Sequence, residues 1–206
     1  VEAADVLVIG GGVSGTNAVR MAMGMEAKVT VLDRSIDRLR ELDMQFGPTL
    51  NTIYSTVDAV ERLALNSDLV IGAVLVPGAA APRLLTADTV RGMRRGAVLV
   101  DIAIDQGGCF ETSRPTTHDD PTYIVDEVVH YCVTNMPAAV ARSSTAALNN
   151  ATLPYALALA DKGFRQALRD DAGLCGGLSV ATGAVTHGAV ADALGLPLAD
   201  VSEVVG

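Results

Sequence analysis

The residues best suited to chemistry form a glycine cluster between an apolar run and a helical pattern near the start of the chain. Gly10, Gly12 and Gly15 fit the spacing G-x-G-x-x-G. In such a turn the first glycine allows a tight bend, the second lets the backbone approach a diphosphate, and the third lets the helix pack against the strand. The unpaired N–H groups that open the helix can bind the anion. The pattern and its context predict a dinucleotide-binding turn, with a glycine-rich turn that binds nothing as the alternative.

A carboxylate, Asp33, ends the next apolar run, where dinucleotide-binding domains place an acidic residue on the adenosine ribose. The same negative charge would repel a 2′-phosphate, so the sequence favours NAD over NADP. Arg34 and Arg38 lie close enough in sequence to weaken this preference. The alternative role for Asp33 is to cap the following helix, and both roles can coexist.

These residues need a scaffold, and the chain supplies alternating strand and helix patterns. We expect strands at 5–9, 28–32, 50–54, 68–73 and 97–101, a weaker one at 131–133, and helices at about 13–25, 36–46, 56–65 and 86–93, with Ser35 capping the second helix. Repeated strand–helix–strand units predict an α/β fold, a doubly wound parallel sheet of the Rossmann type. Ligands bind beyond the carboxyl ends of such strands, which adds segments 74–77, 101–105 and 134–137 as candidate contacts.

The pattern changes after about Pro137. From Ser143 onward helical patterns follow one another without a convincing strand, at 145–160, 164–169 and 188–194, with a glycine-rich separator at 173–177. Pro154 lies inside the longest of them and predicts a kink or a split. The sequence therefore predicts a dinucleotide-binding Rossmann domain at 1–141 and a helical segment of another domain at 142–206.

Composition excludes several other classes of protein. The formal net charge is −9 and the basic residues are scattered, which argues against nucleic-acid binding. No apolar run is long enough to span a bilayer, and no secretory signal opens the chain. The three cysteines, Cys109, Cys132 and Cys175, lack the spacing of metal ligands and predict reduced thiols in a cytoplasmic protein.

Longer motifs carry a family resemblance. The run from Asp101 to Cys109 (DIAIDQGGC) and the stretch from Ser113 to Pro121 closely resemble the signature of the alanine dehydrogenases, and 10–17 and 131–138 match the same family. The resemblance extends over the whole chain. It implies reversible, NAD-dependent oxidative deamination of L-alanine to pyruvate and ammonia. It also implies a homo-oligomer, usually a hexamer, and a substrate domain split between an amino-terminal segment and the return segment 142–206.

The resemblance also assigns residues to the cofactor. It implies that Val13, Ser14 and Asp33 contact the adenosine and phosphates, that Arg38 and Ser55 lie near the adenine, and that Val74 and Leu75 lie along the cofactor. Around the nicotinamide it implies Ile102, Ala103, Ile104, Asp105, Arg114, Val133, Thr134, Asn135 and Met136.

One of these residues, Asp105, is the candidate for catalysis. Its carboxylate could hold the ammonia or imine nitrogen and order a water for proton transfer; the alternative is a carboxylate that only fixes loop or ribose geometry. His118 lies in a long polar loop, which it is expected to order against neighbouring carboxylates, and Cys109 is expected to be structural. No metal is expected, since Ala158 and Lys162 occupy the region of the family's metal position.

The family's substrate-binding Arg and Lys and its acid–base His belong to the amino-terminal segment, which this sequence lacks. We therefore expect the chain alone to bind NAD with little or no turnover of alanine, and its helical segment to expose apolar surface and favour self-association. Two other functions are open. One is the NAD(H)-binding component of a proton-translocating transhydrogenase, and the other is a domain that only senses NAD(H).

Overall fold

The computed structural model describes residues 1–74 and 81–206, which form two compact units, Val1–Met136 and Pro137–Gly206. Each unit is described by itself. The first contains β1 (Asp5–Ile9), α1 (Val13–Gly24), β2 (Lys28–Asp33), α2 (Ile36–Phe46), η1 (Gly47–Thr49), β3 (Leu50–Tyr54), α3 (Val57–Ala64), β4 (Leu69–Gly72), α4 (Ala87–Arg91), β5 (Val98–Asp101), η2 (Ile104–Gln106), β6 (Thr122–Val125) and β7 (Val128–Tyr131).

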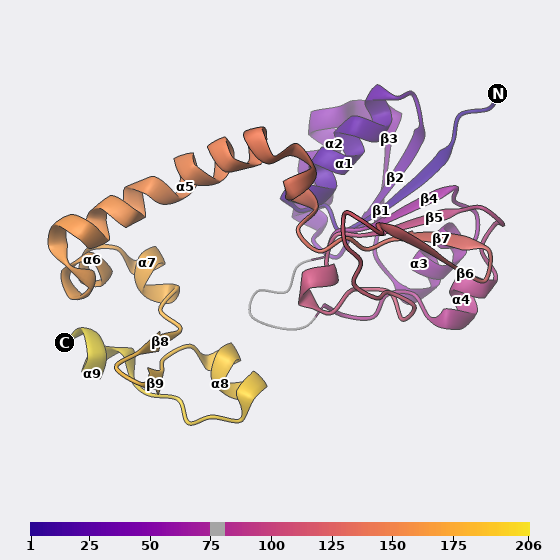
Figure 1. Ribbon diagram of the computed structural model, residues 1–206. Helices are drawn as coiled ribbons and strands as arrows, with labels where there is room; N and C mark the ends of the chain where they lie inside the picture. The colour runs from indigo at the N-terminus through magenta and orange to yellow at the C-terminus, as the bar shows by residue number, and fades with distance from the viewer. Residues whose placement is uncertain (75–80) are drawn as a thin grey trace. The chain divides into compact units, whose positions relative to one another are not determined.

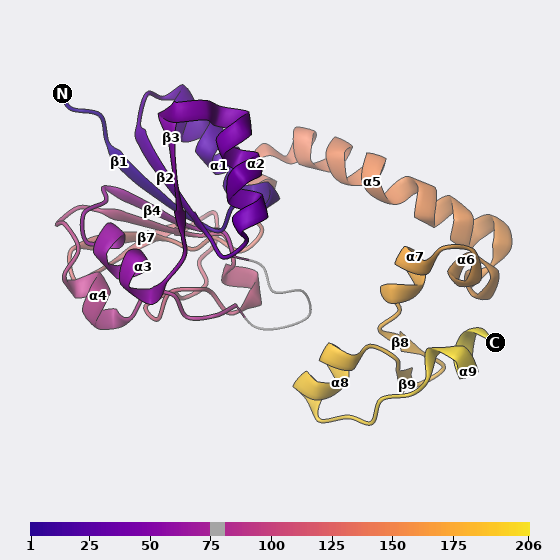
Figure 2. The same ribbon diagram turned by 180° about the vertical axis from the view of Figure 1, so that it is seen from behind.

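One seven-stranded sheet organises this unit, in the order β3-β2-β1-β4-β5-β7-β6 (Figure 1). All neighbours are parallel except the edge pair β6–β7, which is antiparallel. Figure 2 gives the view from behind. The strand order reverses between β1 and β4, the position where doubly wound sheets bind ligands. The prediction of a doubly wound, mostly parallel sheet is confirmed.

Aliphatic side chains fill a core on each face of the sheet. On one face Val19 of α1 and Leu42 of α2 pack in a cluster with Val8 and Val31. On the other, side chains of α3 and α4 pack with Leu7, Ile9 and Leu32, and Phe110 is the largest side chain buried there. Successive residues of a strand point to opposite faces. The central strands, which are mainly apolar, therefore contribute side chains to both cores, as a sheet covered by helices on both sides requires.

The edge of the sheet differs from the sequence prediction. The weak strand expected at 131–133 lies earlier, at Val128–Tyr131, and its hairpin partner Thr122–Val125 was missed. Asp126 and Glu127 connect the two strands, and both have positive φ (47° and 64°). That conformation favours Gly or Asn, so this turn lacks the usual hairpin signal in its sequence.

The second unit is mainly helical and begins within η3 (Met136–Val140). It contains α5 (Ala141–Lys162), α6 (Phe164–Asp170), α7 (Ala172–Gly176), β8 (Val180–Ala181), β9 (Ala184–Val185), α8 (Gly188–Leu194) and α9 (Val201–Val205). Two expectations were wrong: the glycine-rich separator forms α7, and a short antiparallel hairpin, β8–β9, is present. Of the two outcomes expected at Pro154, a kink or a split, the split does not occur, because α5 continues through this residue.

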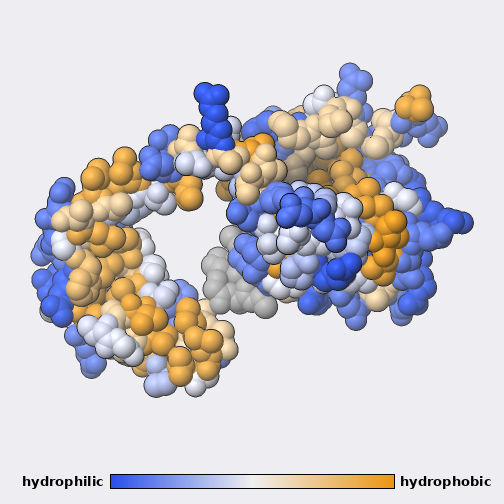
Figure 3. Space-filling model, in the orientation of Figure 1, coloured by the Kyte–Doolittle hydropathy of each residue, from blue (hydrophilic) through white to orange (hydrophobic). Residues whose placement is uncertain are grey.

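No residue of α5 is buried, and Leu148, Leu153 and Leu157 are among its exposed apolar side chains. Because so much of this helix faces solvent, the carbonyl that Pro154 leaves without its N–H partner can be hydrated, which explains the unbroken helix. Figure 3 shows hydrophobic surface over this unit in orange. Within the described part of the chain, no helix has the length and apolar character to cross a membrane.

Candidate cofactor site

The glycine turn has the geometry that its sequence predicts. Gly10 has φ +101° and donates its N–H to the carbonyl of Leu32 at 2.8 Å. A Cβ on Gly15 would lie 1.8 Å from the carbonyl oxygen of Gly10, so only glycine lets α1 pack this close to the turn. A Cβ on Gly12 would meet nothing within 4 Å. This residue precedes α1, and no side chain caps the helix there.

A cavity of about 520 Å³ opens at this helix start. It lies at the carboxyl ends of β1, β2 and β4, where the strand order reverses. Its lining is Ile9, Gly10, Gly12, Val13, Ser14, Leu32, Asp33, Arg34, Ser55, Ala73, Val74, Pro82 and Leu84. An uncapped helix N-terminus with exposed backbone can bind a diphosphate, and the apolar walls can cover a flat ring. This part of the structure fits a dinucleotide.

The sequence identified seven of these lining residues as contacts and missed an apolar group. The structure brings together Gly10, Gly12, Val13, Ser14, Asp33, Ser55 and Val74. The missed residues are Arg34 and five apolar ones, Ile9, Leu32, Ala73, Pro82 and Leu84. Ile9 and Leu32 end or nearly end their strands, which is the signal that could have identified them. Leu75 lies outside the described residues.

Two side chains of opposite charge hold the glycine turn. Asp33 accepts hydrogen bonds from the N–H of Gly11 (2.7 Å) and of Ser35 (2.8 Å). Arg38 donates Nε–H to the carbonyl of Gly11 (2.6 Å) and a terminal N–H to the hydroxyl of Thr16 (2.7 Å). Arg38 therefore contacts the turn and is not among the cavity residues. Ser35 also caps α2 through Arg38 N–H, as predicted.

The residues expected at the nicotinamide lie on the loops after β5 and β7. Residues 102–105 lead into η2, with Asp105 exposed and Ile104 buried beneath it. The loop before β6 is joined to residues 132–135, because Thr116 donates its N–H to Cys132 (2.9 Å) and accepts from Thr134 N–H (3.2 Å). These segments leave neighbouring strands at the same end as the cavity, but they do not line it.

His118 and Arg114 have local partners in this region. His118 Nε2 lies 3.0 Å from the carbonyl of Asn135, so it orders the loop as expected, through a main-chain carbonyl and not through a carboxylate. The guanidinium of Arg114 lies 3.9 Å from the ring centroid of Tyr123, and the N–H of Arg114 donates to the Tyr123 hydroxyl. The guanidinium position is thus set by a stacked ring.

Beneath this loop lies a buried imidazole. His130 is completely buried and stacks on Tyr123 with ring centroids 4.9 Å apart. Its Nδ1 lies 3.0 Å from the carbonyl of Val128, which can only accept, so this nitrogen carries the proton. Nε2 of the neutral ring then accepts from the hydroxyl of Thr112 at 2.8 Å. Burial lowers the pKa of His130, while the Val128 carbonyl and Asp101 act in the opposite direction and Arg114 adds to the lowering.

We expect this imidazole to make stability fall in mild acid. With the folded pKa below the ordinary 6.5, the unfolded chain binds more protons in this range, so the free energy of unfolding decreases as pH drops below about 6.5. Melting temperatures between pH 5 and 7.5 check this. His130→Gln should flatten the acid limb relative to the wild type. An acid limb that is identical in His130→Gln contradicts the assignment.

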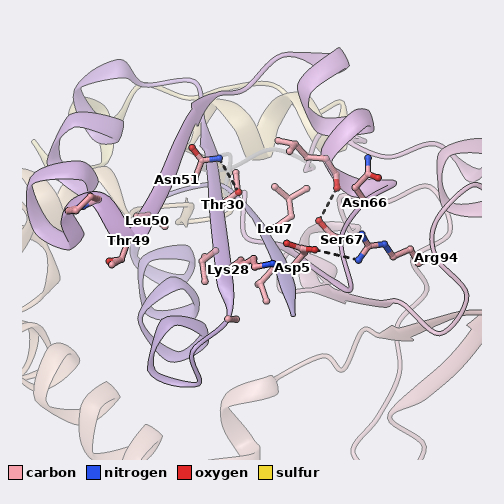
Figure 4. A pocket seen from close by; sticks show the side chains of 15 residues that line it. Asp5, Leu7, Lys28, Thr30, Thr49, Leu50, Asn51, Asn66, Ser67 and Arg94 are labelled. Atoms are coloured by element: carbon pink, nitrogen blue, oxygen red, sulfur yellow. Dashed lines mark hydrogen bonds and ion pairs between the residues drawn. The ribbon is translucent and has the colours of Figure 1, made fainter. Parts of the chain in front are cut away.

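A larger cavity, of about 650 Å³, lies at the opposite, amino ends of β1, β2 and β3 (Figure 4). Several of its polar groups have partners: Arg94 pairs with Asp68 at 2.8 Å, and Asn51 donates to the Thr30 hydroxyl at 3.3 Å. Among the described residues that line it there is neither the glycine turn nor the first residue of an α-helix. The smaller cavity at the carboxyl ends is therefore the candidate site. In the described residues no group of three or more His, Cys, Asp or Glu side chains could hold a metal ion.

Comparison with known proteins agrees with this geometry. Residues 1–188 match the sequence model of the family described as alanine dehydrogenase/PNT, C-terminal domain. The chain belongs to this family. Family and fold together imply a nicotinamide cofactor.

Relatives extend the match over the whole chain. The alanine dehydrogenase of Halomonas elongata is 59% identical over 206 residues, which are 100% of this chain and 56% of that protein. That of Mycobacterium tuberculosis is 55% identical over 204 residues, covering 99% of this chain and 55% of that protein. The chain thus spans about half the length of the curated relatives that it matches.

Solved structures give the same result for the fold. An L-alanine dehydrogenase superposes with a TM-score of 0.85 and 47% identity, over 95% of this chain and 54% of that one. A transhydrogenase from Sinorhizobium meliloti gives 0.62 and 28%, over 70% and 41%. The alanine dehydrogenase is the better match by each of these measures.

Proposed function

We propose that this chain is the NAD-binding half of an alanine dehydrogenase, which converts L-alanine reversibly to pyruvate and ammonia. The observation that carries the proposal is the uncapped start of α1, which opens on the cavity with Asp33 at its rim. Such a site suits a diphosphate joined to a ribose. Named alanine dehydrogenases at 55–59% identity supply the reaction class.

The proposed contacts begin in the cavity and continue onto the loops that follow β5 and β7. The N–H groups of Val13 and Ser14 bind the diphosphate, and Asp33 accepts from the ribose hydroxyls with lone pairs that its two backbone donors leave free. Ser55 lies toward the adenine. Arg38 contributes indirectly, because it holds the glycine turn through the Gly11 carbonyl. Val74 lies along the cofactor. The nicotinamide meets residues 102–105, Arg114 and 133–136.

At the nicotinamide end, Asp105 is the proposed catalytic residue. Bound NAD supplies the hydride acceptor for Cα of alanine. The exposed carboxylate of Asp105 holds the substrate nitrogen and orders the water that exchanges a proton with the reacting centre. Asp105 lies in η2 and is exposed, next to buried Ile104, so its side chain is accessible for this role.

We also propose that residues 142–206 belong to the substrate domain and 1–141 to the cofactor domain. The compact units divide five residues earlier, between Met136 and Pro137. The exposed leucines of α5 are consistent with packing against further protein, in a homo-oligomer of the kind that the family resemblance implies. The cysteines, none of which forms a disulfide, are consistent with the cytoplasm.

A transhydrogenase component is the second candidate, because the family model covers both activities and a transhydrogenase shares the fold. Activity separates the two. A hybrid in which this chain replaces the matching part of the Halomonas elongata protein should reduce NAD when given L-alanine, and oxidise NADH when given pyruvate and ammonium. A folded, NADH-binding hybrid without either activity would reject alanine dehydrogenation.

The chain by itself tests the cofactor. We expect calorimetry to detect NAD and NADH, with NADP weaker by about tenfold or more because its 2′-phosphate faces the Asp33 charge, a difference of about 1.4 kcal/mol. In Asp33→Asn the charge is lost and one backbone amide loses its acceptor, so NAD should weaken while the NADP/NAD affinity ratio rises about tenfold. Asp37→Asn, on the exposed first turn of α2, is the matched control. An unchanged ratio in Asp33→Asn contradicts the specificity argument.

A further inference from the structure

A buried carboxylate lies at the end of β5, outside the cofactor cavity. Asp101 is fully buried. Its Oδ1 accepts from Ala103 N–H (3.0 Å) and the Cys109 thiol (3.3 Å), and its Oδ2 accepts from Cys109 N–H (2.8 Å) and the Ser113 hydroxyl (2.5 Å). All four donors are neutral. A buried charge is costly unless hydrogen bonds replace its water, and here four of them do.

These donors come from both ends of one loop. Ala103 precedes η2, whereas Cys109 and Ser113 follow it, so the carboxylate fastens the two limbs of the loop on either side of Asp105. Ser113 also directly precedes Arg114. Asp101 is therefore the common anchor of two residues that the proposed function assigns to the nicotinamide end.

The loop is closely packed around the Asp101 carboxylate, and at two positions only glycine fits. Gly108 has φ +77°, and a Cβ there would lie 2.8 Å from Asp101 Oδ2 and 2.9 Å from Cβ of Ser113. On the neighbouring strand, a Cβ on Gly72 would lie 2.2 Å from the sulfur of Cys109. The absence of side chains at Gly108 and Gly72 thus allows the loop to pack against Asp101 and β4, and the hydrogen bonds of Asp101 then hold the loop in this position. Burial, with the charge of Asp101 next, raises the pKa of the Cys109 thiol, which keeps it protonated as a donor.

We propose that Asp101 is a positioning residue for the cofactor's nicotinamide end, holding Asp105 and Arg114 where that ring must bind. This inference rests on the proposed function. It requires a carboxylate specifically, since each oxygen accepts one backbone N–H, from Ala103 or from Cys109. The single oxygen of an asparagine can accept from only one of these two N–H groups. Whichever way the amide is oriented, its NH₂ group then faces the other N–H, and two donors meet. The loop must then move.

The experiment compares two ligands on the purified chain. ADP-ribose has the adenosine and diphosphate but no nicotinamide, and NADH has all three. In the wild type we expect NADH to bind more tightly than ADP-ribose and to change its nicotinamide fluorescence. In Asp101→Asn we expect ADP-ribose affinity within about twofold of the wild type, and NADH affinity lower by about tenfold, equivalent to about 1.4 kcal/mol, with the fluorescence change lost.

Two further variants make the test robust against poor folding. Ser113→Ala removes one donor and keeps both backbone hydrogen bonds, so NADH affinity should fall by about two- to threefold, again with ADP-ribose unchanged. Cys109→Ser keeps a donor at the same position and should bind both ligands as the wild type does. Circular dichroism and melting curves report whether each variant is folded. If Asp101→Asn does not fold, the comparison of the two ligands is made with Ser113→Ala instead.

The outcomes separate the two proposals. If the wild type binds neither ligand, the proposed function fails, and this inference fails with it. If the wild type binds NADH no more tightly than ADP-ribose, or if folded variants lose both ligands equally or neither, the inference about Asp101 is overturned while NAD binding stands.

Discussion

Alanine at position 12 is expected to remove cofactor binding while leaving the protein folded. A Cβ on Gly12 meets no atom within 4 Å, and the backbone there (φ −65°, ψ −163°) suits any residue. The methyl group would instead occupy the space through which a diphosphate approaches the start of α1. We expect NAD affinity to fall by about a hundredfold, or about 2.7 kcal/mol, with little change in melting temperature.

Gly15→Ala, in contrast to Gly12→Ala, should mainly lower the melting temperature. Its Cβ would lie 1.8 Å from the Gly10 carbonyl, a contact that α1 or the turn can relieve only by moving apart. Overpacking of this kind costs about 1–3 kcal/mol or more, so the melting temperature should drop clearly. Gly24→Ala, at the open end of the same helix, is the matched control and should be neutral or slightly stabilising. Calorimetric titration and thermal melts of the three variants check this, and equal binding losses at 12 and 24 would refute the diphosphate geometry.

The parts of the fold that the sequence predicted are those with local signals. The turn glycines, the apolar strands β1 to β5 and the Ser35 cap are each encoded within a few neighbouring residues, and each was found. Strand β7 was misplaced and β6 was missed, because the turn between them, Asp126–Glu127, adopts positive φ without glycine or asparagine. Tertiary pairing with β5 fixes that edge, and no short window of sequence contains this information.

In the site, too, residues with a local sequence signal were predicted and contacts that depend on the folded chain were not. Gly12 and Asp33 are recognisable because dinucleotide binding demands those residue types at that spacing. The positions of Arg38 and Asp101 are not recognisable in this way. Arg38 turns back onto the Gly11 carbonyl, a choice of side-chain direction that helix position does not specify. The four hydrogen bonds of Asp101 exist because the loop returns Cys109 and Ser113 to it, so they follow from the folded loop.

The catalytic proposal for Asp105 predicts the largest effect on turnover. In the hybrid with the Halomonas elongata protein, Asp105→Asn keeps the size of the side chain and removes the charge that holds the substrate nitrogen and orders water. Loss of a group that positions a proton transfer costs about 10²- to 10⁴-fold in rate, so we expect kcat for alanine oxidation to fall by at least a hundredfold. Because asparagine keeps the shape of the side chain beside the nicotinamide, and the diphosphate and ribose bind in the cavity, NADH affinity should change by no more than about threefold.

The control for this prediction is Asp119→Asn, an exposed carboxylate on the adjacent loop that should leave kcat within about twofold. Two results have different meanings for Asp105→Asn. A kcat within tenfold of the unmodified hybrid would mean that the carboxylate only shapes its turn, which is the alternative role. A large loss of kcat with an equal loss of NADH affinity would mean that the loop has moved, as expected for Asp101→Asn. A loss confined to kcat assigns the proton-transfer role to Asp105. In that case unchanged NADH affinity shows that the turn is still in place, so the missing charge alone accounts for the lost activity.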